Sequence, residues 1–524
     1  MKRIFAGLAF AVAFGAQAAT YYLSDCQAGA AVGCVVGNDS NPGTSATAPW
    51  RSTAKLQAAF NAGKPGDQFL LARGGAWANV NMVMFNFNGG APAAMIANPM
   101  VIDSYAPSWG STAKPILAGL TGESLFDFTN SGPPDANGGH VLRNLSLKGD
   151  GVGVRLFNGV QNVTLENLTV DGFSAGVACG GVVDPATNPS FITVRNSTFT
   201  NNRAIAVGMW GCYHVLVEGN TLDNNGFERP MLDHPIYISG NSYGSTVTDV
   251  VIRNNRLTNN SVSTGYCRAS VIVGHDVGAD WIIENNYIYQ APNTSYPTCW
   301  GISFSPANGG YLEGMDRMVI RGNTLVNVGN NAIEIAACRT CLIENNVIVW
   351  ETITEAAGIR HHIAPTTPTY VGTALTIRNN SIYFFGTNDV SRGIIVNDQG
   401  TDHTVVSNLI YFGAGSFANA CFETNLADSA FTAWGNNLCF GGPFGKAGTG
   451  DVATNPQFVA VPSLTNGFSM ALAPASPAKA AGDVTRSAPR DKTTCRRPAL
   501  PSIGAYDAVV AGCTKPAATA TSLH

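Results

Sequence analysis

The chain has 524 residues, of which 12% are Asp, Glu, Lys or Arg and 45% are apolar. This ordinary apolar share excludes an intrinsically disordered chain. The formal net charge is -4 and no basic block is present, so the sequence lacks the positive surface of a nucleic-acid-binding protein.

The N-terminus is typical of an export signal. A basic start precedes an apolar run over residues 4–14, and Ala16 and Ala18 are the small residues that a signal peptidase recognises. We predict a signal peptide over residues 1–19 and a secreted or periplasmic protein. No later run reaches the ~20 apolar residues of a membrane-spanning helix, so no membrane span is expected.

A short phrase recurs through the middle of the chain: an apolar-x-apolar segment, then Asn, often doubled, then another apolar residue. Within each copy the apolar residues alternate with period two and β-branched residues dominate, which indicates short strands. Such a unit buries its inner face only by stacking on neighbouring copies, so the repeat predicts an all-β fold, a parallel β-helix. The Asn residues of the copies are Asn144, Asn167, Asn196, Asn220, Asn255, Asn286, Asn323, Asn346, Asn380, Asn408 and Asn437.

The recurring Asn predicts a sharp turn at the same place in each coil. Asn tolerates the left-handed backbone conformation, and its side-chain amide can hydrogen-bond to the Asn of the next coil. We expect one position per coil to serve both purposes.

The chain resembles the right-handed β-helix family of secreted carbohydrate-active proteins, which includes pectate, alginate and chondroitin lyases and mannuronan epimerases. Besides the repeats, GNDSNPGTSATAPWRSTAKLQAAF near the mature N-terminus is similar to the family's opening loop and capping helix, and NPQFV, ASPAKAAG and PSIGAYD resemble its closing cap. The helix is also expected from the residues, because Ser52 can cap it, Leu56 and Phe60 share one face, and Gly63 can end it.

The resemblance implies a right-handed parallel β-helix with a cap at each end. We place an N-terminal strand and capping helix at residues 20–64, the β-helix at 65–450, and a C-terminal cap and tail at 451–524. The resemblance also implies a polysaccharide partner, expected to be acidic, and a monomer. Because this fold hosts many chemistries, it does not decide the reaction.

The twelve cysteines of an exported chain predict disulfides rather than metal ligands. Two predicted pairs close short loops in the caps, one ties the last coil, and one joins successive coils: Cys26–Cys34, Cys495–Cys513, Cys421–Cys439 and Cys267–Cys299. No partner is predicted for Cys179, Cys212, or the two cysteines of the C-x-x-C motif, Cys338 and Cys341.

Aligning the second strand of each coil places alternate residues on the outer face of the predicted helix. His361 is expected to point inward as a core histidine. The expected outward column is Arg155, Ala178, Ala206, Tyr237, Ile272, Ser303, Glu334, Arg360 and Ile395.

Five reactive side chains come from three consecutive coils and are expected to meet at one site. We assign His234 as a base and Tyr237 as an acid, with Asp233 orienting His234. Arg203 and Arg268 are assigned to neutralise a substrate carboxylate. Four further residues are expected to bind substrate: Glu334, Arg360, His275 and Trp210.

These residue types suit removal of the proton α to a sugar carboxylate. We therefore predict a polysaccharide lyase that cleaves a uronic-acid-containing polymer by β-elimination. No lysine occurs between Lys148 and Lys446, so the calcium-plus-lysine arrangement of several β-helix lyases cannot be built on the body. No acidic cluster stands out as a Ca²⁺ site, and no metal or other cofactor is expected.

Other functions stay open at this point. A glycoside hydrolase or a C5-epimerase could use the same scaffold, and a non-catalytic polysaccharide-binding protein would need only outward aromatic rings that stack on sugars. The segment LDHPIYISG resembles the Asp-Pro-His stretch of mannuronan epimerases only in part.

Overall fold

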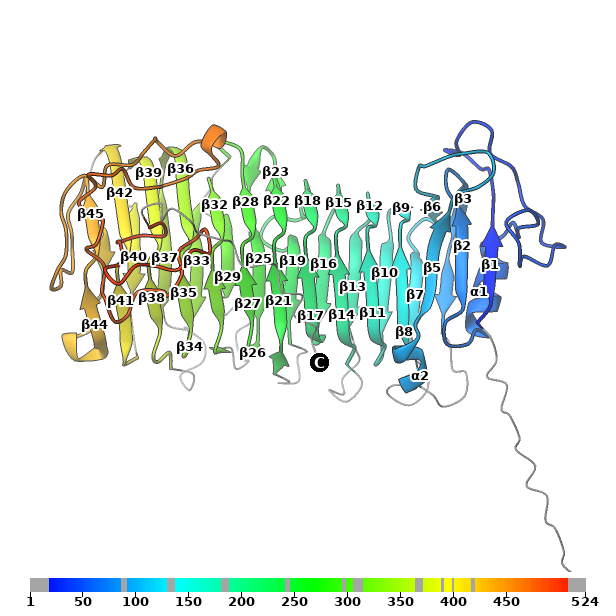
Figure 1. The fold of residues 1–524 in the computed structure, drawn as a ribbon, viewed down its shortest axis with the longest axis horizontal. Coiled ribbons are helices and arrows are strands. Elements are labelled where there is room, and N and C mark those ends of the chain that lie inside the picture. The colour runs from blue at the N-terminus through cyan, green and yellow to red at the C-terminus, as the bar shows by residue number, and fades with distance from the viewer. Residues whose placement is uncertain are drawn as a thin grey trace, which may run out of the picture.

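The computed structural model describes residues 18–85, 92–129, 137–180, 188–240, 246–294, 298–304, 314–362, 371–387, 391–397, 400–415 and 420–507. Over these residues the chain winds into a long parallel β-helix with three faces (Figure 1). The predicted all-β fold is confirmed. Most of the expected signal peptide and Cys513 lie outside the described residues.

Three long parallel sheets, here called A, B and C, form the faces, and each coil supplies one strand to each sheet in the order C, A, B. Sheet A holds β1 (Thr20–Leu23), β2 (Gln68–Ala72), β5 (Met100–Tyr105), β8 (Gly138–Arg143), β11 (Gln161–Glu166), β14 (Ser190–Arg195), β17 (Tyr213–Glu218), β21 (Val250–Arg253), β27 (Ile282–Glu284), β31 (Val319–Arg321), β35 (Leu342–Glu344), β38 (Thr376–Arg378), β41 (His403–Val406) and β44 (Phe431–Gly435). Sheet B holds β3 (Ala76–Val80), β6 (Ile116–Gly119), β9 (Ser146–Lys148), β12 (Thr169–Asp171), β15 (Thr198–Thr200), β18 (Thr221–Asp223), β22 (Arg256–Thr258), β28 (Tyr287–Tyr289), β32 (Thr324–Val326), β36 (Val347–Thr354), β39 (Ser381–Thr387), β42 (Leu409–Gly415) and β45 (Leu438–Phe440). Sheet C holds β4 (Met82–Met84), β7 (Ser124–Thr129), β10 (Val152–Phe157), β13 (Ala175–Gly180), β16 (Ile205–Trp210), β19 (His234–Ser239), β25 (Ser270–His275), β29 (Trp300–Phe304), β33 (Asn330–Ala336), β37 (Ala356–His362), β40 (Arg392–Val396) and β43 (Phe422–Glu423).

Smaller elements lie between the faces and at the ends. A short fourth sheet contains β20 (Val247–Thr248), β26 (Val277–Ala279), β30 (Gly314–Asp316) and β34 (Cys338–Arg339), and β23 (Val262–Ser263) pairs with β24 (Tyr266–Cys267) as an antiparallel hairpin. The helices are α1 (Thr53–Asn61), α2 (Pro92–Ala97), η2 (Asp428–Ala430) and η3 (Leu464–Asn466). Among the described residues, no helix has the length and hydropathy needed to cross a membrane.

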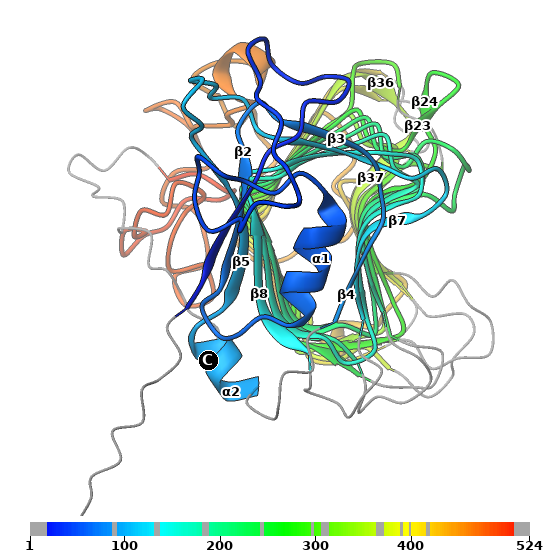
Figure 2. The same cartoon turned by 90° about the vertical axis from the view of Figure 1, so that its right-hand side faces the viewer.

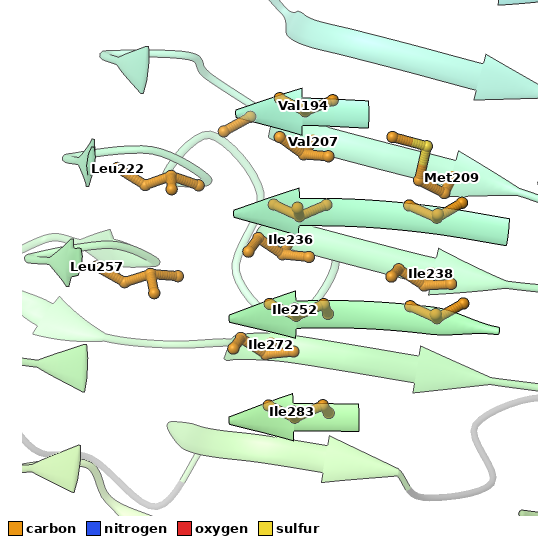
Figure 3. Packing of buried hydrophobic residues seen from close by; sticks show 14 of the residues in the cluster. Val194, Val207, Met209, Leu222, Ile236, Ile238, Ile252, Leu257, Ile272 and Ile283 are labelled. Atoms are coloured by element: carbon orange, nitrogen blue, oxygen red, sulfur yellow. The ribbon is translucent and has the colours of Figure 1, made fainter. Parts of the chain in front are cut away.

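The core is a set of apolar stacks that run along the helix axis. On sheet C, Val207, Ile236 and Ile272 are register partners on adjacent strands, and all three are fully buried (Figure 3). Facing them from sheet A are Ile252 and Ile283, which also pair in register (Figure 3). Because side chains alternate along a strand, each inward apolar residue places its neighbours on the outer face.

The two residues of each doubled Asn have different roles, the left-handed turn and the side-chain ladder, which were both expected at one position. The first residue of each pair takes the left-handed conformation, as Asn254 does with φ 57° and Asn285 with φ 56°. The second residue is buried, and its amide continues a ladder from coil to coil, as between Asn255 and Asn286. The expectation of a single position with both roles was wrong, because the two roles need different backbone angles. In coils that carry one Asn, that residue takes one of the two positions: Asn196 is the left-handed turn residue, whereas Asn323 follows the left-handed Gly322 and belongs to the ladder.

The N-terminal end of the helix is closed by α1, which lies across the opening framed by the three sheets (Figure 2). As predicted, Ser52 caps the helix by accepting a hydrogen bond from the Lys55 backbone N–H, and Leu56 and Phe60 are fully buried. The helix ends at Asn61, two residues before Gly63. Strand β1 is already part of sheet A through its pairing with β2, so the N-terminal strand belongs to the coiled body.

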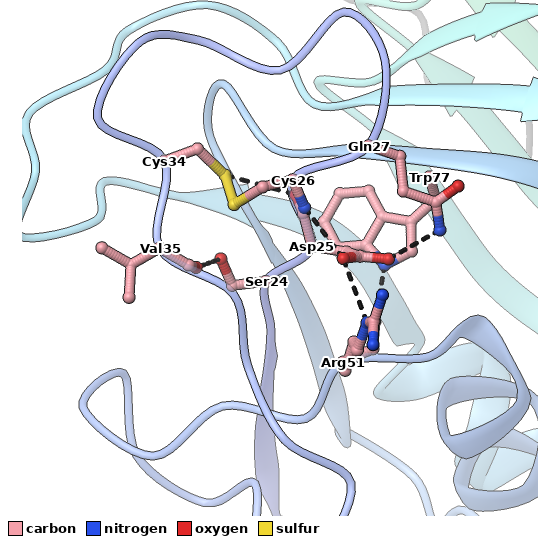
Figure 4. The surroundings of a disulfide bond; sticks show 8 residues. All are labelled: Ser24, Asp25, Cys26, Gln27, Cys34, Val35, Arg51 and Trp77. Carbon is pink, nitrogen blue, oxygen red and sulfur yellow. Dashed lines mark hydrogen bonds and ion pairs between the residues drawn. A yellow bond between two sulfur atoms is a disulfide. The ribbon is translucent and has the colours of Figure 1, made fainter.

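The predicted disulfide Cys26–Cys34 closes a loop of this N-terminal end (Figure 4). Next to it, the Asp25 carboxylate accepts hydrogen bonds from the Cys26 backbone N–H at 2.9 Å and from Gln27 Nε2 at 2.8 Å, and pairs with Arg51 Nε at 3.2 Å. These contacts tie the loop to the chain that leads into α1.

Four further disulfides are present among the described residues. Cys267–Cys299 and Cys421–Cys439 confirm the predicted pairs. Cys179–Cys212 and Cys338–Cys341 had no predicted partners. The fourth predicted pair, Cys495–Cys513, includes a residue outside the described part of the chain.

The segment after β45 covers the outside of the body as well as its end. It packs Phe468, Met470 and Ile503 against the outer face of sheet B in a second apolar cluster. It also binds earlier coils through a buried Arg497, whose Nη2 donates to Asn345 Oδ1 at 2.8 Å. The C-terminal segment is therefore a strap along several coils, because it follows outward apolar residues of sheet B.

Candidate functional site

The outer face of sheet C carries the residues that the sequence analysis singled out. The observed outward column, read from the strand register, is Asp127, Arg155, Ala178, Gly208, Tyr237, Val273, Ser303, Glu334, Arg360, Ile395 and Glu423. Two predicted members, Ala206 and Ile272, are fully buried instead. Their strands begin with unbroken apolar runs, so period-two alternation did not fix which residue faces outward.

Tyr237 is the centre of an aromatic cluster on this face. It lies on β19 between the inward Ile236 and Ile238 (Figure 3). Its ring centroid is 5.8 Å from that of His234, 5.6 Å from His275 and 5.7 Å from Trp210. These side chains come from β16, β19 and β25, which are neighbours in sheet C. The fold therefore brings together two residues predicted as catalytic and two predicted to bind substrate.

The position of the Trp210 ring depends on Gly208, two residues earlier on β16. A Cβ atom built on Gly208 would lie 2.4 Å from the Trp210 ring. The indole thus lies folded back over the outer face beside Tyr237, and any larger residue at position 208 would displace it.

His234 is held as a neutral imidazole. Its Nδ1–H donates to the Ser270 carbonyl oxygen at 2.9 Å, which fixes the tautomer and leaves Nε2 with a lone pair. The side chain is 6% exposed, and burial lowers its pKa from 6.5 to about 4. No hydrogen bond to Nε2 is found within the described part of the chain. His234 can therefore accept a proton at neutral pH.

Asp233 does not orient His234, contrary to the expectation from sequence. Its buried carboxylate binds Arg229, four residues earlier, with Arg229 Nη2 at 2.7 Å and Nε at 3.1 Å from Asp233 Oδ1. The Ser270 backbone does the orienting instead. An adjacent Asp-His pair in sequence could not reveal this, because the loop before β19 folds back on itself to place Arg229 on the carboxylate.

The two predicted arginines lie at the starts of the strands that flank β19. The Arg203 guanidinium has two contacts within the chain. Its Nη2 donates to the Asp150 carbonyl oxygen at 3.0 Å, and its Nε lies 3.7 Å from Glu228 Oε1. The Arg268 guanidinium carbon lies 5.9 Å from the centre of the Tyr266 ring, on the hairpin of β23 and β24.

A second polar site lies further along the same face, around β33, β37 and β40. Glu334 and Arg360 are register partners, but Glu334 Oε1 accepts a hydrogen bond from His362 Nε2 at 2.8 Å instead of pairing with the arginine. No hydrogen bond or ion pair to the Arg360 guanidinium exists among the described residues. His361, between Arg360 and His362, is fully buried as predicted.

Arg360 lines a pocket of about 230 Å³ on this part of sheet C. Other lining residues are Asn331, Glu355, Arg392, Asn397 and Glu423. The sequence analysis did not single out Asn331 or Arg392. Both lie at the strand position that His234 occupies on β19, three residues before the residue of the outward column. Aligning this position across the coils, as was done for the outward column, could have revealed them.

The two sites are separated by four strand spacings from Tyr237 to Arg360, or ~19 Å. The structure thus keeps Glu334 and Arg360 apart from the aromatic cluster, while Trp210 and His275 join it. Among the described residues, no group of three or more His, Cys, Asp or Glu side chains is placed to hold a metal ion.

Comparisons with known proteins concern the fold. Residues 135–296 match the family model of the right handed beta helix region. No curated protein matches the chain. A solved catalytic domain of a GH87 alpha-1,3-glucanase in complex with nigerose is 19% identical, with a TM-score of 0.46, over 73% of this chain and 67% of that one.

Two other solved structures are similar at comparable levels. A pectate lyase is 14% identical, with a TM-score of 0.37, over 94% of this chain and 98% of that one. The Dettilon tailspike protein is 15% identical, with a TM-score of 0.41, over 67% of this chain and 62% of its own length, so the chain spans less than two thirds of that protein. From the family match and the strand order, residues 135–296 form a right-handed β-helix region, and the same parallel sheets continue on both sides of it.

Proposed function

We propose that this protein is a secreted polysaccharide lyase that cleaves a uronic-acid-containing polymer on the outer face of sheet C. The observation that carries the proposal is the contact between a neutral, buried His234 and the outward Tyr237. A base and a hydroxyl group side by side on an open strip are the two groups that β-elimination requires.

The chemistry follows from these two side chains. His234 Nε2 takes the proton from C5, α to the sugar carboxylate, and a double bond forms between C4 and C5. The bond from C4 to the glycosidic oxygen breaks, and that oxygen leaves with the Tyr237 hydroxyl proton. The cycle closes when the protonated His234 loses its proton to solvent and the Tyr237 phenolate regains one from solvent, which restores both groups.

Neutralisation of the substrate carboxylate falls to Arg268 rather than Arg203. Removal of the C5 proton builds negative charge on the carboxylate, and a guanidinium matches that charge with two parallel hydrogen bonds. Arg203 contacts Asp150 and Glu228. Arg268 lies two residues before β25, the strand that carries His275.

The two glutamates of the outward column, Glu334 and Glu423, are not spaced as a hydrolase pair. Hydrolases place two carboxylates ~5 to 9.5 Å apart across the bond. On this face Glu334 and Glu423 are separated by three strand spacings, or ~14 Å. Glu334 is hydrogen-bonded to His362, and Glu423 pairs with Arg392. A non-catalytic binder would not need a histidine held in one tautomer.

Product analysis on a panel of acidic and neutral polysaccharides tests the proposal. A lyase product carries an unsaturated sugar end that absorbs ultraviolet light. We expect that product from the wild-type protein, and ~10²-fold lower turnover from His234→Asn and from Tyr237→Phe, the usual worth of general acid–base catalysis.

Two matched controls lie on another face. Tyr213 and His214 are adjacent on β17 of sheet A, so Tyr213→Phe and His214→Asn should keep wild-type turnover. Undiminished activity in both folded site variants would move the chemistry elsewhere. A new reducing end without absorbance would indicate hydrolysis, an inverted sugar would indicate epimerisation, and no product would indicate a binding protein.

A further inference from the structure

The pocket around Arg360 contains two hydrogen-bond donors that have no partner in the described part of the chain. Asn331 is 2% exposed, and its Nδ2 has no hydrogen-bond partner among the described residues. The Arg360 guanidinium has none there either, although Glu334 lies on the adjacent strand. Buried polar groups are normally paired, so two donors at one pocket without a partner among the described residues are candidates for binding a ligand.

Three other polar residues of the pocket are paired with one another: Arg392, Asn397 and Glu423. Arg392 Nε pairs with Glu423 Oε2 at 2.8 Å, and Asn397 Nδ2 donates to Glu423 Oε1 at 3.4 Å. The Arg392 and Glu423 charges therefore offset one another. Two charged lining residues, Arg360 and the exposed Glu355, have no ion-pair partner among the described residues. Of these two, the Arg360 guanidinium is the group that can bind an anion.

The floor of the pocket leaves room for a sugar. In the register column Asn331–Ala357–Arg392, the middle residue is an alanine, so no side chain fills the space between its two longer neighbours. The pocket volume is about 230 Å³, many times the ~10 to 15 Å³ that one water needs on the same measure, so the space can take a group much larger than a water.

A track of polar and aromatic residues connects this pocket to the aromatic cluster. In the strand register, His234 is followed by Ser270, Trp300 and Asn331 on successive strands of sheet C. The Trp300 Nε1 also has no hydrogen-bond partner among the described residues. A pyranose unit is about as long as one strand spacing, so a linear polymer along this track would place about one sugar on each coil.

We propose that the pocket around Arg360 and Asn331 binds the carboxylate of a second uronic-acid unit, about four sugars from the bond that is cleaved. This inference rests on the proposed function, which places the cleaved bond of the polymer at His234 and Tyr237. It deepens that function by requiring a long acidic polymer whose axis follows the helix axis.

Binding, measured without turnover, tests the proposal independently of catalysis. The probes are saturated heptamers of galacturonate, mannuronate and guluronate, with a neutral cello-oligosaccharide for comparison, titrated by calorimetry into His234→Asn protein. We expect at least one acidic heptamer to bind, and Arg360→Ala to weaken its binding about tenfold or more. Asn331→Asp should weaken it further than Asn331→Ala, since a carboxylate would repel the ligand. The corresponding trimer, which cannot reach both sites, should lose less affinity.

The control is Arg317→Ala, which removes an exposed arginine paired with Asp280 on the short fourth-sheet side of the helix. It should bind the heptamer as the parent does. Equal binding by Arg360→Ala and the parent, equal losses for trimer and heptamer, or no binding of any acidic heptamer would overturn the proposal. Tight acidic binding that depends on Arg360, combined with no unsaturated product from wild-type protein, would leave this inference standing and remove the lyase function.

Discussion

The side-chain amide of Asn286 donates to Asn323 Oδ1 at 3.0 Å, and the backbone N–H of Asn286 donates to the same oxygen at 2.9 Å. Asn323 in turn uses its Nδ2 to bind the Ile283 carbonyl oxygen and Asn346 Oδ1. One fully buried side chain thus satisfies polar groups of two other coils. Its removal leaves several buried donors and acceptors without partners.

Asn323→Ala should therefore destabilise the β-helix strongly. Each buried group left without a partner costs ~1 to 3 kcal/mol, and we expect a total loss of about 2 to 4 kcal/mol. Urea unfolding followed by circular dichroism measures the change. The control Asn81→Ala removes an exposed amide with one long contact to Glu123 and should change the midpoint little. Equal effects of the two variants would show that the ladder adds no stability.

Acid should destabilise the protein well before its carboxylates are protonated. Burial lowers the pKa of His140 and of His361 from 6.5 to about 3. Because the unfolded chain binds these protons near pH 6.5, stability is present above that pH and is lost as pH falls from 6.5 toward 3. His361→Leu should flatten this loss. Thermal melting between pH 7 and pH 4 checks it, and a midpoint that does not change across this range would contradict the expectation.

The pH profile of turnover should carry the signature of His234. A base with its pKa at about 4 stays deprotonated down to that pH, so the acidic limb of kcat/KM should lie near pH 4 rather than near 6.5. Steady-state rates on the cleaved polymer give this limb. A limb near pH 6.5 would assign the base to a histidine that is more exposed to water.

The disulfide Cys179–Cys212 should contribute more to stability than Cys338–Cys341. The first closes a loop with a separation of 33 residues and the second a separation of 3. The loss of chain entropy on cross-linking predicts about 3 to 4 kcal/mol for the longer loop and roughly 1 to 2 kcal/mol for the shorter one. Double Cys→Ala variants compared by thermal melting test this order, and the reverse order would reject the loop-length explanation.

The recurring phrase determined the fold because alternation and repetition are local properties of the chain. The copies around Asn255 and Asn286 predict stacked parallel strands, and Ser52, Leu56 and Phe60 predict α1. Inward and outward faces follow from the period of two, which correctly placed Tyr237, Glu334 and Arg360 outside and His361 inside. Where the apolar run was unbroken, as before Gly208, the alternation did not show which residue faces outward. Only the strand register determined it.

Partners of polar groups were decided by the tertiary structure, since they depend on how loops fold and on which coils stack. Their adjacency in the sequence suggested that Asp233 orients His234. In the structure the Asp233 carboxylate binds Arg229, and the His234 imidazole donates to the Ser270 carbonyl oxygen of the next coil. The stacking of coils likewise brings Cys179 to Cys212 and leaves Asn331 Nδ2 without a hydrogen-bond partner in the part of the chain that the structure describes. The repeat in the sequence sets the number and spacing of strands, and contacts between coils set which charges are neutralised and which remain available to a ligand.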